Sequence, residues 1–150
     1  MDNKATISVL NDLIETCLDG HKGFAECADD LKNPELKRTM MARSQDCSTA
    51  ASELQQMVTQ LGGEPEQSSS VSGALHRKWV DIKSAITGKS DEAILNECER
   101  GEDVALKAYK EAVQKDLPAD VRTLIERQLQ GVQRNHDQVK ALRDAERARS

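Results

Sequence analysis

Four long stretches of this sequence place apolar residues at helical intervals, and short breaks separate them. The stretches span about residues 5–32, 35–61, 91–115 and 119–147. Residues three and four positions apart share one face of a helix, so each stretch predicts an amphipathic helix with one face to bury. Asn33-Pro34 and Leu117-Pro118 mark two breaks, because proline begins helices well and disfavours helical backbone in the residue before it. The sequence therefore predicts an all-α protein.

The breaks between these helices differ in length, and the difference predicts the topology. Tight turns join the first helix to the second and the third to the fourth, so each pair must be antiparallel. The connection between the pairs begins at Gly62-Gly63, carries a shorter predicted helix at 74–87, and is long enough to cross the bundle. A plain up-down-up-down bundle would need only a short link. We therefore expect one ferritin-like four-helix-bundle domain over residues 1–150, arranged up-down-down-up with a long crossover.

The composition suits such a bundle and argues against a large β-sheet core. Hydrophobic residues make up 37% of the chain and charged residues 31%, with one Phe, one Trp and one Tyr. A helix needs only one buried stripe, whereas a sheet core draws on alternating β-branched and aromatic residues. Because so polar a chain has a limited core, pairing two copies would bury more surface, and we expect a homodimer.

Charge and the pattern of apolar residues restrict the partners and the location. The net charge of −5 repels phosphate, so nucleic acid is not an expected partner. The sequence shows neither an apolar run of membrane-spanning length nor a signal-peptide pattern, so we expect no membrane association and a cytoplasmic protein. In that compartment the four cysteines are expected to be reduced thiols. No sequence feature identifies a protein partner.

Three polar residues interrupt the apolar stripes and are predicted to face the interior of the bundle. They are His21, Glu102 and His136, and Glu102 belongs to the acidic segment ILNECERGED. In the crossover topology these three and three further residues fall within about 6 Å of one another along the bundle axis. The further residues are Asp46, Cys47 and Cys98. The sequence thus predicts a polar layer that crosses the bundle.

The polar layer has two main interpretations. In the first, His136 pairs with Glu102, which satisfies both groups, fixes the helix register and requires no cofactor. In the second, the layer binds one divalent metal ion, zinc or iron, with His21, Glu102 and His136 as core ligands. Asp46, Cys47 or Cys98 would then complete the ligand set.

Other chemistries fit the sequence less well. A di-iron site in a bundle uses Glu-x-x-His pairs, whereas the last helix carries Gln133-x-x-His136, which disfavours a di-iron oxidase or iron store. Cys17 and Cys47 lie at similar heights on neighbouring helices and could form a regulatory disulfide, although small buried cysteines are more often packing residues. The sequence contains no hydrolase triad, phosphate-binding glycine loop or dinucleotide fingerprint.

Motifs along nearly the whole chain point to a known family. They are LNDLIETCLDGHKGF (10–24), NPELK (33–37), LGGEPE (61–66), SGALHRKW (72–79) and ILNECERGED (94–103), followed by DLP, ERQL and NHD between 116 and 137. Together they resemble a bacterial family of ferritin-like four-helix-bundle proteins of unknown function, related in fold to rubrerythrin- and bacterioferritin-type proteins. The resemblance implies a stress-associated setting without an established enzymatic activity, and it implies a carboxylate at the position of His21. We expect a non-enzymatic, stress-associated binding or interaction protein, with a mononuclear metal-binding protein as the alternative.

Overall fold

The computed structural model of the protein describes residues 2–67 and 90–149, whose backbone forms four long helices. These are α1 (Asn3–Asp30), α2 (Pro34–Gln60), α4 (Asp91–Val113) and α5 (Ala119–Arg149). Every helix begins and ends within two residues of the position expected from the sequence. The short crossover helix expected at 74–87 lies outside the described residues.

Local side-chain and backbone chemistry explains where the helices begin and end. The side chains of Asp2, Asn33 and Ser90 each accept a hydrogen bond from a backbone N–H in the first turn of the helix that follows. Such N-caps satisfy donors that have no partner within the helix. At the end of α2, Gly62 has a φ of 84°, a conformation that glycine adopts without a steric penalty.

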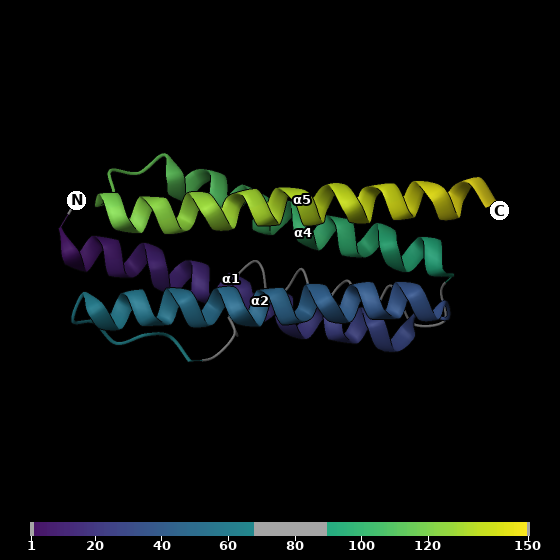
Figure 1. The fold of residues 1–150 in the computed structure, drawn as a ribbon, viewed down its shortest axis with the longest axis horizontal. Coiled ribbons are helices and arrows are strands. Elements are labelled where there is room, and N and C mark those ends of the chain that lie inside the picture. Colours follow the sequence, from purple (N-terminus) through teal and green to yellow (C-terminus); the bar gives the residue numbers. More distant parts are fainter. Residues whose placement is uncertain (1, 68–89, 150) are drawn as a thin grey trace.

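The four helices form a bundle of two antiparallel pairs, α1 with α2 and α4 with α5, which meet through α1 and α4 (Figure 1). The carboxylate of Asp91, at the start of α4, accepts the backbone N–H of Lys32 at 2.8 Å and of Asn33 at 3.0 Å, in the turn after α1. Helix α4 therefore begins beside the end of α1 and runs antiparallel to it, in the same direction as α2. This is the up-down-down-up order of ferritin-like bundles. The predicted fold class is confirmed, and the part of the chain that the structure describes contains no strand.

Helices α2 and α5 approach each other much less closely than the other neighbouring helices do. Long polar side chains bridge the distance between them. Arg127 of α5 pairs with Glu53 of α2 at 3.1 Å, and Arg43 of α2 donates a hydrogen bond to Gln138 of α5. The α2–α5 side is therefore the loosely packed side of the bundle.

The buried apolar residues form two clusters, one toward each end of the bundle. The cluster near the α1–α2 turn includes Phe24, Leu31, Leu36, Met40, Ile94, Leu95 and Val139. The cluster at the opposite end includes Leu10, Ile14, Leu54, Val58, Tyr109, Val121 and Ile125. Burying one such side chain contributes roughly 1.5–3 kcal/mol, so each end is held by its own core. None of the described helices has a stretch both long and apolar enough to cross a membrane.

Candidate functional site

A pocket of about 420 Å³ occupies the layer between the two apolar clusters and receives residues from all four helices. Its inner wall includes Gly20, Gly101 and Ala105, which have little or no side chain to fill the space. Exposed residues of α2 and α5, among them Asp46 and Arg127, line its outer part. The pocket therefore opens on the loosely packed α2–α5 side.

Glu102 is the most unusual residue of this pocket. Its side chain is only 3% exposed, and neither carboxyl oxygen has a hydrogen-bond partner within residues 2–67 and 90–149. Burial raises its pKa from the ordinary 4.5 to about 8, opposed by the positive charge of Arg43 and reinforced by the charges of Asp103, Glu99 and Asp137. A pKa of about 8 favours the protonated carboxylic acid at neutral pH, and that form offers one O–H donor and one carbonyl acceptor to the pocket.

A second polar group in the pocket is, by contrast, fully hydrogen-bonded. The Tyr109 hydroxyl donates to Oε1 of Gln128 at 2.8 Å, and Nε2 of Gln128 donates to Oε1 of Glu53 at 3.0 Å. Because the hydroxyl proton points to Gln128, the Cys17 thiol is the donor in its 3.1 Å contact with the Tyr109 oxygen. This chain of hydrogen bonds links all four helices and gives the pocket a fixed wall beside Glu102.

The thiols around the pocket are packing groups in this structure. Cys47 fits closely against α1, since a Cβ on Gly20 would lie 3.0 Å from its Sγ. Burial raises the pKa of Cys47 well above its usual value and that of Cys17 to about 11. Cys98 is fully buried beside Cys27, and its pKa is likewise raised by burial. Since the thiolate is the reactive form, burial makes these thiols less reactive at neutral pH than an exposed cysteine.

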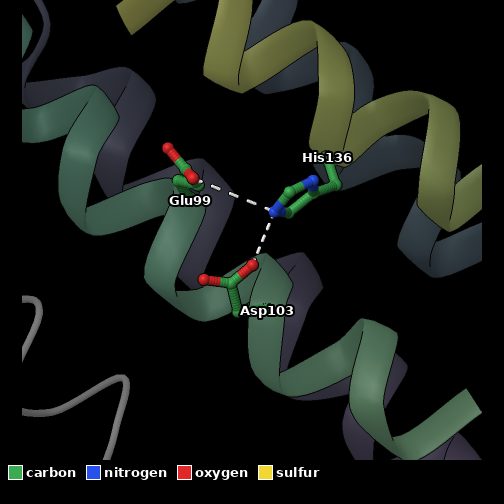
Figure 2. Close-up of side chains that lie close together, drawn as sticks. All are labelled: Glu99, Asp103 and His136. Atoms are coloured by element: carbon green, nitrogen blue, oxygen red, sulfur yellow. Dashed lines mark hydrogen bonds and ion pairs between the residues drawn. The ribbon is translucent and has the colours of Figure 1, made fainter. Parts of the chain in front are cut away.

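A separate cluster joins α4 to α5 near the pocket. Figure 2 shows the ring of His136 pointing toward the carboxylates of Glu99 and Asp103. Nε2 of His136 lies 2.5 Å from Oδ1 of Asp103 and 3.9 Å from Oε1 of Glu99. The other ring nitrogen, Nδ1, lies 3.4 Å from Oδ1 of Asp137. The second oxygen of Glu99 binds the guanidinium of Arg143.

The structure separates the three core ligands expected from the sequence. His21 is engaged with Ser44, whose carbonyl and hydroxyl oxygens lie 3.0 and 2.9 Å from its Nδ1. Glu102 lines the pocket without a hydrogen-bond partner among the described residues, whereas His136 contacts Asp103 and Glu99. The interpretation that pairs His136 with Glu102 is therefore wrong for this structure. In the part of the chain that the structure describes, the one cluster of three potential metal ligands shares only His136 with the expected set.

The residues expected to complete that ligand set are also dispersed. Asp46 is exposed and pairs with Arg43 at 2.9 Å, Cys47 lines the pocket, and Cys98 belongs to the apolar cluster near the α1–α2 turn. Glu99, Asp103 and Gln128 were not predicted from the sequence to be site residues. The sequence signal that could have identified these residues is their spacing along the helices. Glu99 and Asp103 are one helical turn apart, and Gln128 stands two turns before His136 on the same face of α5.

The helix order and the pocket define the class of this protein, a ferritin-like four-helix bundle with a cavity in its middle layer. Residues 5–115 match the family described as Domain of unknown function (DUF2383), and the chain belongs to this family. The match covers α1, α2 and α4 and ends before α5, so it includes Glu102 and leaves out His136. The comparison with curated proteins gave no match.

Proposed function

We propose that the protein is a small-molecule-binding bundle and not a catalyst, with its ligand held in the pocket beside Glu102. The observation that carries this proposal is the buried carboxyl group of Glu102, which faces a cavity and has no hydrogen-bond partner in the part of the chain that the structure describes. A buried polar group left without a partner costs about 1–3 kcal/mol. A ligand that hydrogen-bonds to Glu102 would remove this cost.

The size and chemistry of the pocket support an organic ligand. Its volume of about 420 Å³ lies within the range of ligand pockets, which are mostly apolar with a few placed polar groups. Phe24, Ala105 and Val132 supply apolar wall, and Glu102 supplies both a donor and an acceptor. We therefore infer a ligand with an apolar body and one hydrogen-bonding head group.

The same residues argue against a di-iron oxidase. His136 belongs to the cluster with Asp103 and Glu99 instead of pointing at Glu102, and Gln133 stands where a Glu-x-x-His pair would need its carboxylate. A closer kinship to rubrerythrin- or bacterioferritin-type proteins is supported by the helix order alone. A stress-associated, cytoplasmic role and a homodimer stay part of the proposal, supported by composition and by the family resemblance.

The pocket can be tested by filling it. In Ala105→Leu the larger side chain occupies the cavity, whereas Ala108→Leu makes the same change one turn later on α4, at a residue that does not line this pocket. We would record amide NMR spectra with three probes of similar shape, 2-phenylethanol, 2-phenylethylamine and 3-phenylpropanamide. At least one probe should shift the amide signals of Gly20, Gly101 and Gly131.

The two variants then separate binding in the pocket from binding elsewhere. The shifts should disappear in Ala105→Leu and persist in Ala108→Leu. If no probe shifts these glycines at millimolar concentration, or if the shifts survive in Ala105→Leu, the pocket is not a ligand site and the proposal fails.

A further inference from the structure

The cluster of Glu99, Asp103 and His136 brings three potential metal ligands together outside the pocket. The two carboxylates stand one turn apart on α4, and the imidazole reaches them from α5 (Figure 2). One donor atom from each residue lies within 4.8 Å of the other two. This arrangement is independent of the ligand proposed for the pocket.

The contacts of His136 raise the question of which of its ring nitrogens carries a proton. Both of its ring nitrogens contact a carboxylate, Asp103 at Nε2 and Asp137 at Nδ1. An imidazolium would donate to both, whereas a neutral imidazole carries a single N–H and can donate to only one of them. When Nδ1–H donates to Asp137, the lone pair of Nε2 faces the oxygens of Asp103 and Glu99. Three electron-rich atoms then converge, and a cation placed among them would satisfy all three.

Neighbouring side chains hold His136 and Glu99 in place, as the residues around the ligands of a metal site do. A carboxylate on the distal nitrogen of a metal-binding histidine fixes its tautomer and orientation, and Asp137 has this position on His136. Arg143 holds one oxygen of Glu99 and leaves Oε1 directed at His136. The side chains of His136 and Glu99 are only 14% and 13% exposed, whereas that of Asp103 is 57% exposed. Solvent therefore reaches the cluster past Asp103.

We propose that Glu99, Asp103 and His136 form a binding site for one divalent transition-metal ion, with zinc as the best-suited ion. Imidazole and carboxylate are ordinary zinc ligands, at about 2.0–2.2 Å from the metal. A hard ion such as magnesium or calcium prefers an all-oxygen shell. The Nε2–Oε1 separation of 3.9 Å allows the metal between the two atoms, and Asp103 is exposed enough to rotate away from its close contact. Three protein ligands leave the fourth zinc position to water.

The test is zinc titration of protein without an affinity tag, by calorimetry, with cobalt(II) absorption as a spectroscopic readout of the ligand shell. We expect one zinc ion per chain. His136→Ala and Asp103→Ala should each weaken zinc binding at least tenfold, and Asp137→Asn about tenfold through loss of the orienting carboxylate. Asp103 is exposed, so its variant reports on the site even if His136→Ala folds poorly.

Two control variants separate this site from general affinity for zinc. Glu92→Gln removes a carboxylate that also bridges α4 and α5, through Arg147 at 2.8 Å. His21→Ala removes a histidine outside the cluster. Both should keep wild-type zinc affinity and the cobalt spectrum. Less than one bound zinc ion per chain would overturn the proposal, as would equal losses in the controls and in the ligand variants.

Discussion

The hydroxyl of Tyr109 and the side-chain amide of Gln128 join α4 to α5 through a buried hydrogen bond of 2.8 Å. Tyr109 is 1% exposed and Gln128 is 7% exposed, so both partners are largely shielded from bulk water. The same hydroxyl accepts the Cys17 thiol from α1. One phenol thus holds three helices in register beside the pocket.

Removing that hydroxyl should destabilise the bundle. In Tyr109→Phe the acceptor on Gln128 and the thiol of Cys17 both lose their partner, and we expect a loss of about 1–3 kcal/mol in the free energy of unfolding. Urea denaturation followed by circular dichroism measures it. Thr59→Ala, which removes an exposed hydroxyl bonded to Gln55, should change stability by less than about 0.5 kcal/mol. Equal stability of Tyr109→Phe and wild type would show that the buried bond contributes nothing.

The raised pKa of Glu102 predicts a dependence of stability on pH. Between pH 4.5 and about 8 the carboxyl is ionised in the unfolded chain and protonated in the folded one. The folded state therefore binds one more proton than the unfolded state in this range. The contribution of Glu102 to the free energy of unfolding is complete below pH 4.5 and is lost as the pH rises through the pKa of Glu102 in the folded protein. The slope approaches about 1.4 kcal/mol per pH unit within this window.

Glu102→Gln isolates that contribution, because it keeps the shape of the side chain and cannot ionise. From pH 5 to pH 8, the free energy of unfolding of wild type should fall steadily relative to that of this variant. Parallel curves for the two proteins would mean that the pKa of Glu102 in the folded protein is not raised.

Asp91 should stabilise the fold by joining the α1–α2 turn to α4. Its carboxylate accepts the backbone N–H groups of Lys32 and Asn33, and bonds to a charged group are stronger than neutral ones. Asp91→Ala should lower the free energy of unfolding by about 1–3 kcal/mol. The neighbouring Glu92 forms an exposed ion pair with Arg147, so Glu92→Ala should cost under about 1 kcal/mol. If Asp91→Ala and Glu92→Ala unfold at the same temperature, the hydrogen bonds of Asp91 add no more stability than the exposed ion pair of Glu92.

The polar composition and limited core predict self-association. Light scattering over a range of protein concentrations should give twice the chain mass of 16.6 kDa, because pairing buries surface that one chain cannot cover. A mass of one chain at every concentration would remove the homodimer from the proposed function.

The helices themselves could be predicted from the sequence. The apolar stripes and the breaks at Asn33-Pro34 and Leu117-Pro118 are local signals, and the structure places the helix ends within two residues of the predicted ones. The length of the connection between α2 and α4 predicted the order of the helices correctly, since tight turns allow only antiparallel neighbours.

The candidate site was harder to predict because it depends on helix rotation and separation. Glu102 and Asp103 are adjacent in sequence, and a rotation of about 100° per residue turns one into the pocket and the other toward His136. The sequence does indicate the height of a residue along the bundle, but Glu102 and Asp103 have nearly the same height, so height does not tell them apart. No periodic pattern reveals that α2 and α5 stand apart and leave room for a cavity, since that spacing depends on how all four helices pack together.

The division of the apolar core into two clusters has a consequence for how this bundle could evolve. Most residues that hold the ends together, such as Leu10 and Met40, do not line the cavity, whose inner wall includes Gly20, Gly101 and Ala105. Cys17, Phe24 and Tyr109 belong both to an apolar cluster and to the pocket wall. Substitutions in the middle layer can therefore alter the shape and polarity of the cavity while both ends stay packed. The shape of the cavity and the packing of the two ends are thus set by largely different residues, so related chains could present different cavities within one unchanged scaffold.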